Sequence, residues 1–175
     1  MMYPFLSAIL PVITPAAVPE MSLEEFDELA QEQLSEKDFC KLIAADTPDA
    51  GNLLPVYQEM KCFKECLNYR IAAMRAEKLK TNEHFEVPGE IYGEIDFALA
   101  SAVSASPLER EKIIDAACWR KLDELEISHE MDLIHFCVYR MKLAMLQKYS
   151  KRDGDAGCKN FEAALEKLAA NFNEP

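Results

Sequence analysis

The chain has 175 residues, half of them hydrophobic, and its 31 acidic and 19 basic side chains give a net charge of −12. This apolar content excludes a disordered protein, because disordered chains bury too little apolar surface to offset the entropy lost on folding. The length fits one domain with one core. The negative charge argues against nucleic-acid or anionic-membrane binding, since a basic patch supplies most of the affinity in both.

The first 19 residues contain no charged side chain. The apolar stretch from Phe5 to Val18 has the size of a signal-peptide hydrophobic region and is shorter than the roughly 20 residues that span a bilayer. Ala16 and Ala17 are small enough for a cleavage site. The sequence therefore predicts a signal peptide over residues 1–19 and a secreted, extracellular domain over residues 20–175. A packed or disordered N-terminal tail is the alternative.

Helix signals begin directly after this segment. Ser22 and Glu25 have the spacing of a capping box, and an apolar stripe follows until the loop at residues 46–52. Pro55 suits the first turn of a long helix that we expect to end near Leu79.

The second half of the chain contains the clearest helix start. A loop is predicted at residues 81–89 and a short helix at residues 90–103. Ser106 and Glu109 then form a capping-box pattern around Pro107.

The next helix is predicted from His129 to Tyr149, with Ser128 as its cap. It is apolar on most of its circumference, so we expect it to be the buried central helix. A loop at residues 152–157 precedes a last helix whose apolar stripe comprises Phe161, Ala164, Leu165, Leu168 and Phe172. No alternating strand segment or internal repeat is present, so the fold is predicted to be all-α and a single domain.

The six cysteines are Cys40, Cys62, Cys66, Cys118, Cys137 and Cys158. An even number behind a predicted leader favours disulfides, although the spacing alone leaves their pairing open. Reduced cysteines that pack as small hydrophobic side chains are the alternative. A zinc site that uses Cys62 and Cys66 is disfavoured, because the chain has no second closely spaced pair of ligands.

One part of the cysteine pattern resembles a known family. The segment Lys61-Cys-Phe-Lys-Glu-Cys-Leu67 resembles the region around the second and third cysteines of insect odorant- and pheromone-binding proteins. Cys40, Cys118 and Cys137 resemble their first, fourth and fifth cysteines, and the resemblance covers about residues 22–150. Leu146 occupies the usual place of the sixth. The chain therefore looks like a divergent member, similar to the salivary proteins of blood-feeding flies that sequester amines or eicosanoids.

The resemblance implies a fold and a function. The fold would be a compact domain of about six to seven helices, cross-linked around an internal apolar cavity. By order, the bridges would be Cys40–Cys66, Cys62–Cys137 and Cys118–Cys158. The function would be that of a non-catalytic extracellular carrier or scavenger of a small hydrophobic ligand, without cofactor or metal. A homodimer or a receptor contact is the protein partner that such a carrier allows.

The pocket residues follow from the helices that form the cavity wall in this family. Each candidate is also compatible with an ordinary core position, and His135 is either a core histidine or a pH-sensitive pocket residue. The candidates are Met74, Phe97, Ile114, Ile134, His135, Tyr139, Met141 and Met145.

Two other classes of function are alternatives to the carrier. An enzyme is disfavoured, because the chain lacks the common catalytic motifs and because His135 and Cys137 point about 200° apart on a helix. The stronger alternative is a cytosolic, acidic helical interaction protein with reduced, buried cysteines. The redox state of the cysteines separates it from the carrier.

Overall fold

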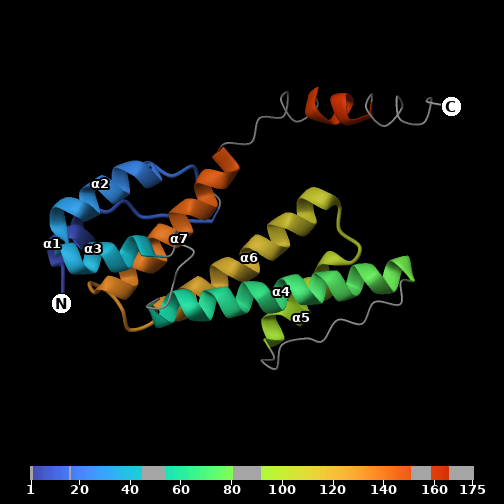
Figure 1. Cartoon of the computed structure of the whole chain (residues 1–175), viewed down its shortest axis with the longest axis horizontal. Coiled ribbons are helices and arrows are strands. Elements are labelled where there is room, and N and C mark those ends of the chain that lie inside the picture. The colour runs from blue at the N-terminus through green and yellow to red at the C-terminus, as the bar shows by residue number, and fades with distance from the viewer. Residues whose placement is uncertain (1, 16, 45–53, 81–91, 151–158, 166–175) are drawn as a thin grey trace.

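The central helix is α7 (Leu133–Ser150), against which α2, α3, α4 and α6 all pack. The computed structural model describes residues 2–15, 17–44, 54–80, 92–150 and 159–165. In Figure 1, α1–α3 lie on one side of α7, and α4–α6 lie on the other. The other helices are α1 (Pro4–Ile9), α2 (Leu23–Gln33), α3 (Glu36–Ile43), α4 (Pro55–Leu79), α5 (Gly93–Ala102), α6 (Pro107–Glu126) and an unnumbered helix at residues 159–165.

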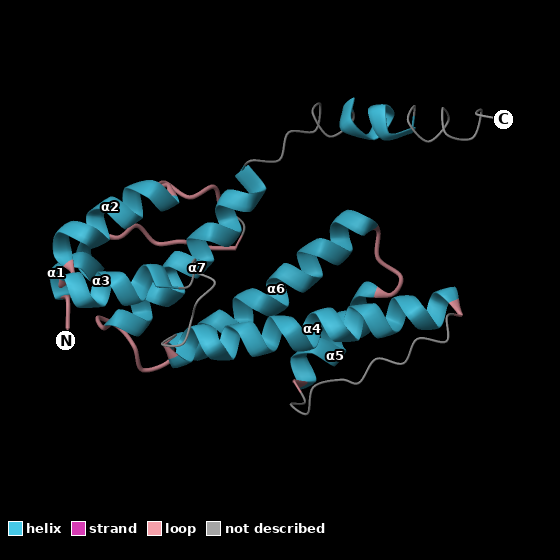
Figure 2. Cartoon of the chain, viewed as in Figure 1, coloured by secondary structure: helices cyan, strands magenta, loops and turns pink. Residues whose placement is uncertain are grey.

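The predicted all-α class is confirmed. The described residues form helices and no strand, apart from an isolated antiparallel bridge between Met2 and Asp132 (Figure 2). Three side chains of α7 that have no exposed surface, Phe136, Val138 and Leu143, belong to one core cluster. The prediction that this helix is central and buried is therefore confirmed.

Several helices begin at the capping residues that the sequence predicted. Ser22 and Glu25 form both hydrogen bonds of a capping box at the start of α2, and Ser106 and Glu109 do so at the start of α6. Helix α4 begins with Pro55 and ends at Leu79, as predicted. The predicted loops at residues 46–52, 81–89 and 152–157 lie outside the described residues.

The predicted helix at residues 90–103 is observed as the shorter α5. The largest differences from the predicted boundaries lie in the first helical segment and at the start of α7. The first segment divides into α2 and α3, because the Ser35 hydroxyl accepts a hydrogen bond from the Asp38 N–H and begins a new helix. Helix α7 begins at Leu133 rather than at His129. The Asp132 carboxylate, not Ser128, accepts hydrogen bonds from the first turn of α7. Ser128 has a φ of 72°, which is outside the helical region.

The N-terminal segment is built into the fold. Leu6 is 1% exposed and belongs to the core, and the Tyr3 N–H donates to the Met131 carbonyl at 2.7 Å. The Tyr3 hydroxyl also donates to Asp38 at 2.7 Å, and this bond lowers the pKa of that carboxyl. The described part of residues 1–19 thus has the packed form that the sequence left open as the alternative to a signal peptide.

Candidate functional site

An open groove with a volume of about 590 Å³ lies between α4, α6 and α7. We call it the α4–α7 groove. Its lining combines apolar, cationic, anionic and thiol side chains. Its lining comprises Tyr57, Met60, Lys61, Lys64, Glu65, Asn68, Asp115, Cys118, Arg140, Met141, Ala144, Met145 and Lys148.

The helix period places the lining residues of α7 on one face. Met141, Ala144, Met145 and Lys148 follow the i, i+3, i+4, i+7 spacing, so they lie one above another along the groove. Methionine side chains adapt to the shape of an apolar partner. Ala144 is exposed and contributes only a methyl group, so the middle of the groove stays open. The floor is therefore apolar and adaptable.

Three lysines, Lys61, Lys64 and Lys148, form a basic rim that the two carboxylates of the lining, Glu65 and Asp115, neutralise only in part, although the whole chain is acidic. Lys61 lies 4.0 Å from Glu65, and Lys148 lies 3.2 Å from Glu111, all at exposed or partly exposed positions. Lys64 is exposed and makes no ion pair with any residue that the structure describes. Exposed pairs of this kind contribute little to stability, so their cations can be shared with an incoming group. The groove thus favours an apolar ligand with negative charge at its edges.

The thiol in the groove is not an activated nucleophile. Burial raises the pKa of Cys118, and the charge of Lys64 offsets this only in part. Burial likewise raises the pKa of Cys137 in the core to about 11. Reactive cysteines have a lowered pKa, so both thiols are protonated at neutral pH.

The predicted pocket residues do not converge on one site. Met141 and Met145 line the α4–α7 groove. Met74 and Ile114 line a small pocket between α4, α5 and α6, and Phe97 is 71% exposed on α5. Large core side chains fill the space between the helices, so the described residues do not support the predicted internal cavity. These are Phe26, Phe63, Leu122, Phe136 and Leu143, all with no exposed surface.

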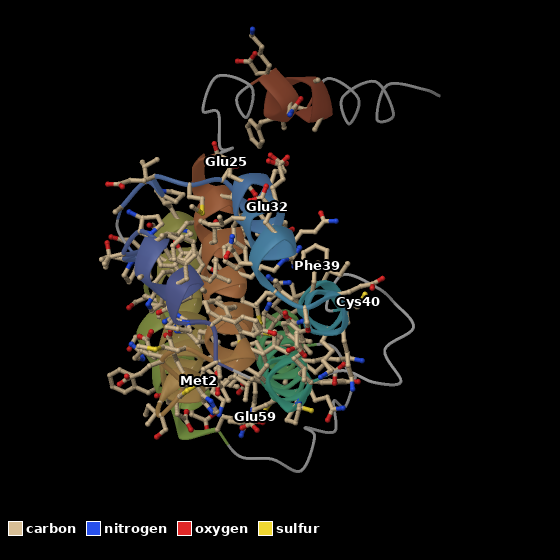
Figure 3. All side chains as sticks on the ribbon, turned by 90° about the vertical axis from the view of Figure 1, so that its left-hand side faces the viewer. Met2, Glu25, Glu32, Phe39, Cys40 and Glu59 are labelled. Atoms are coloured by element: carbon tan, nitrogen blue, oxygen red, sulfur yellow. The ribbon has the colours of Figure 1, made fainter. Side chains whose placement is uncertain are left out.

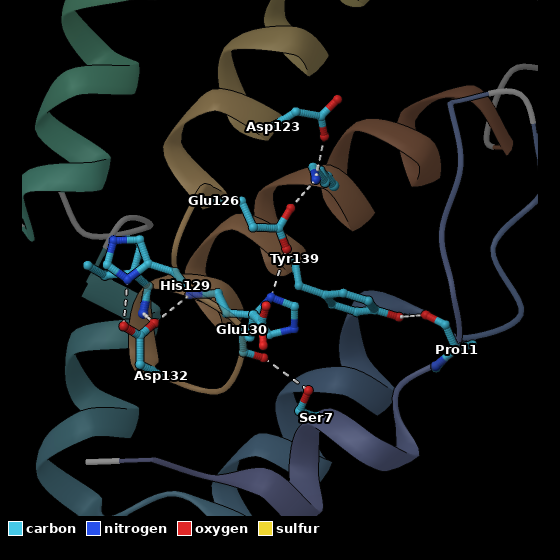
Figure 4. Close-up of polar contacts among 11 residues, drawn as sticks. Ser7, Pro11, Asp123, Glu126, His129, Glu130, Asp132 and Tyr139 are labelled. Carbon is cyan, nitrogen blue, oxygen red and sulfur yellow. Dashed lines mark hydrogen bonds and ion pairs between the residues drawn. The ribbon is translucent and has the colours of Figure 1, made fainter.

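The other three candidates, Ile134, His135 and Tyr139, lie on α7 but do not line the α4–α7 groove. Ile134 packs at the edge of the core. The Tyr139 hydroxyl donates to the Pro11 carbonyl at 2.9 Å, and burial raises the pKa of Tyr139 to about 12 (Figure 4). Its polar atom is therefore used within the fold.

His135 has an acidic neighbour instead of an apolar pocket. Its Nδ1 lies 2.7 Å from Oε1 of Glu126, close enough for an ion pair but without the alignment of a hydrogen bond. The other oxygen of Glu126 contacts the Lys142 ammonium, which also lies 2.6 Å from Asp123 (Figure 4). The predicted role of His135 as a pocket residue required apolar surroundings, and the structure places this carboxylate there instead.

The contacts of Glu126 predict a contribution to the acid sensitivity of the fold. Burial alone would raise the pKa of Glu126, but contacts with His135 and Lys142 lower it overall from 4.5. A carboxyl whose pKa is lower in the folded state stabilises the fold above its unfolded pKa, and this stability is lost as the pH falls through the folded value. We expect Glu126→Gln to be less stable than the unmodified protein at pH 7 and to lose less further stability between pH 5 and 3.

Urea unfolding of both proteins at pH 7, 5 and 3 measures these differences in the free energy of unfolding. Asp38 and Asp132 also have lowered pKa values, so both proteins should lose some stability in acid. The contribution of Glu126 is the excess loss in the unmodified protein. An equal loss in the two proteins would contradict the assignment.

Sequence reasoning missed most of the groove. The missed residues include Met60, Lys61 and Lys64 on α4 and Ala144 and Lys148 on α7. Lysines and methionines recur at helical spacing in the sequence of both α4 and α7. This pattern identifies a site only when the relative placement of α4, α6 and α7 is known.

The described cysteines are free thiols, which corrects the predicted bridges. Cys40 and Cys62 are exposed, whereas Cys66 and Cys137 are buried in the core. Figure 3 shows Cys40 at the outer edge of α3. None of these four cysteines is bonded to another in the structure, so Cys40–Cys66 and Cys62–Cys137 are not formed. Cys158 lies outside the described residues, and Cys118 is a buried free thiol.

This arrangement predicts a pattern of thiol reactivity. In the native, unreduced protein, we expect iodoacetamide to modify Cys40 and Cys62 rapidly and Cys66, Cys118 and Cys137 only after unfolding. The physical reason is access, together with the raised pKa of the last two. Mass spectrometry of tryptic peptides after timed alkylation identifies each site. Unreactive Cys40 and Cys62 that become alkylated only after reduction would show that they are bridged.

The described part of the chain has neither a metal-binding cluster nor a membrane-spanning helix. It contains no group of three or more His, Cys, Asp or Glu side chains placed to hold a metal ion. None of its helices combines the length and apolar character needed to cross a membrane. No protein-family model, curated protein or solved structure matches the chain. The resemblance to odorant-binding proteins therefore stays a prediction.

Proposed function

We propose that the protein is a non-catalytic interaction protein that binds an amphipathic helix with acidic flanks in the α4–α7 groove. The observation that carries this proposal is the methionine-rich floor beside a lysine rim, on a chain with a net charge of −12. The five free thiols support it, because reduced cysteines belong to the interaction protein rather than to the disulfide-linked carrier.

The shape of the groove suits a helix. Helix-binding grooves take apolar anchors at i, i+3, i+4 and i+7, and the α7 wall repeats with the same spacing. Adaptable methionines line the wall, as they do in other surfaces that accept varied helices. Lys61, Lys64 and Lys148 would orient an acidic partner, since complementary charge at a rim mainly sets encounter rate and specificity.

The carrier of a small hydrophobic ligand is the second candidate. Met141 and Met145, both predicted from the sequence as ligand-binding residues, line the groove. The volume of about 590 Å³ also falls within the range of about 300–1,000 Å³ that is usual for small-molecule sites. A fatty acid would place its tail on the methionines and its carboxylate beside Lys64. The open form of the groove favours the helix, because most ligand sites enclose their ligand.

The test uses two synthetic helical peptides of about 15 residues with the same leucine stripe, since shorter helices are marginal in water. Glutamates flank the stripe in one peptide and lysines in the other. We expect the full-length protein to bind the acidic peptide at micromolar affinity, about −8 kcal/mol, and the basic peptide much more weakly. Fluorescence anisotropy measures both affinities.

Two tryptophan variants locate the site. Ala144→Trp fills the middle of the groove from an exposed position and should weaken binding at least about tenfold, or ~1.4 kcal/mol. Ala100→Trp, at an exposed position on α5 outside the groove, is the matched control. Equal binding of the two peptides, or binding that Ala144→Trp leaves unchanged, would contradict the proposal. Binding of a fluorescent fatty acid, blocked by Ala144→Trp, without peptide binding would establish the carrier instead.

A further inference from the structure

The C-terminal helix at residues 159–165 presents an apolar pair to solvent. Phe161 is 65% exposed and Leu165 is 49% exposed, at i and i+4 on one face. Figures 1 and 3 show this helix apart from the body of the protein, beyond the end of α7. A short helix is marginal in water and gains most of its stability by packing an apolar face. This helix therefore needs a partner surface.

The α4–α7 groove begins where the chain leaves α7. Its last lining residue on that helix is Lys148, two positions before the helix ends at Ser150. Eight residues separate Ser150 from Lys159 in the sequence. That length spans at most roughly 30 Å, and connections of about 2–8 residues are usual between antiparallel neighbouring helices. The C-terminal helix can therefore return along α7.

The helix and the groove also complement each other chemically. Phe161 and Leu165 match the apolar wall of Met141 and Met145, and Ala144 leaves space for a large side chain between these two methionines. Glu162 flanks the apolar pair and supplies a negative charge for the lysine rim, whereas Lys159, the other charged residue of this helix, lies on the face away from Phe161. These are the same features that we assign to a partner helix.

We propose that the C-terminal helix of the same chain docks in the α4–α7 groove, antiparallel to α7. The protein then has a form in which its own helix fills the groove and a form, the one in Figure 1, in which the groove is open. The docked helix would compete with a partner helix, and this second part rests on the proposed function. The C-terminal helix would thus reduce the affinity of the protein for its partner helix.

Site-specific photocrosslinking of the full chain tests the docking. Benzoylphenylalanine replaces Phe161 in an equal mixture of ¹⁴N- and ¹⁵N-labelled protein, and crosslinked peptides are identified after digestion. We expect crosslinks to peptides of α4 and α7 that line the groove. Each should join two peptides that carry the same nitrogen isotope, as a crosslink within one molecule does. Benzoylphenylalanine at Phe97, exposed on α5, is the control and should give no crosslink to that face of α7.

Three results would overturn the docking proposal. The first is the absence of groove peptides among the crosslinks. The second is crosslinks that join the two isotope labels, which would assign the groove to a second copy of the chain. The third is crosslinks that persist in Ala144→Trp, because the filled groove should exclude the helix.

Competition has a separate readout. Phe161→Ala/Leu165→Ala alters two exposed positions and should leave the fold intact. If the helix occupies the groove about 90% of the time, this variant should bind the acidic peptide about tenfold more tightly. Unchanged affinity would overturn the competition. Crosslinks to the groove without peptide binding would support the docking and refute the proposed function. Peptide binding without such crosslinks would support the proposed function and refute the docking.

Discussion

Removal of residues 1–19 should destabilise the protein by at least about 3 kcal/mol, a large part of the ~5–15 kcal/mol that is usual for a domain. The truncation deletes the buried Leu6 side chain, and loss of a buried leucine alone costs about 2–5 kcal/mol. It also removes the acceptor of the Tyr139 hydroxyl and the Tyr3 contacts with Asp38 and Met131. Urea unfolding of the full chain and of residues 20–175 measures the loss.

Two point variants of the full chain refine this experiment. Leu6→Ala should reproduce much of the loss, whereas Val12→Ser, at a position that is 91% exposed, should change little. The result also bears on the signal-peptide prediction. A truncated chain as stable as the full one would show that the segment is dispensable for the fold, as a cleaved leader must be.

Replacement of Asp27 by alanine should cost about 2–3 kcal/mol, because Arg140 is buried and loses its carboxylate partner. Nε of Arg140 lies 2.7 Å and Nη2 2.8 Å from the two oxygens of Asp27, which joins α2 to α7. Breaking a fully buried pair costs about 3–5 kcal/mol, and the exposed quarter of the Asp27 side chain reduces the expected value.

The double variant Asp27→Leu/Arg140→Met tests whether the charge or the contact matters. An apolar pair of similar volume often replaces a buried ion pair without loss, so we expect it to recover most of the stability lost in Asp27→Ala. Urea unfolding of the two single variants Asp27→Leu and Arg140→Met, of the double variant and of the unmodified protein gives the coupling between the two sites. Additive losses would contradict a direct interaction between Asp27 and Arg140.

Features that depend on a few neighbouring residues were predictable from the sequence. The capping boxes at Ser22 and Ser106 and the proline start of α4 each involve residues within one turn, so the pattern determines the geometry. The division at Ser35 was missed, although its cap is also local, because the continuing apolar stripe suggested one longer helix.

Features that join distant segments were not predictable. Whether Cys62 meets Cys137 depends on how α4 and α7 are rotated against each other, and the spacing of cysteines along the chain does not contain this information. His135 was expected in apolar surroundings because its neighbours in α7 are apolar. Its actual partner, Glu126, ends the preceding helix. The α4–α7 groove likewise exists only where three helices meet.

The contacts of the N-terminal segment have a consequence for synthesis on the ribosome. Ser7 bonds to Glu130, Pro11 to Tyr139 and Asp27 to Arg140, across 123, 128 and 113 residues of chain. At translation rates of about 5–20 residues per second, the first helices wait roughly 6–25 s before α7 is made. During that interval their apolar side chains have no core to enter, so folding must be largely post-translational, and the nascent chain is most prone to aggregate just before its central helix emerges.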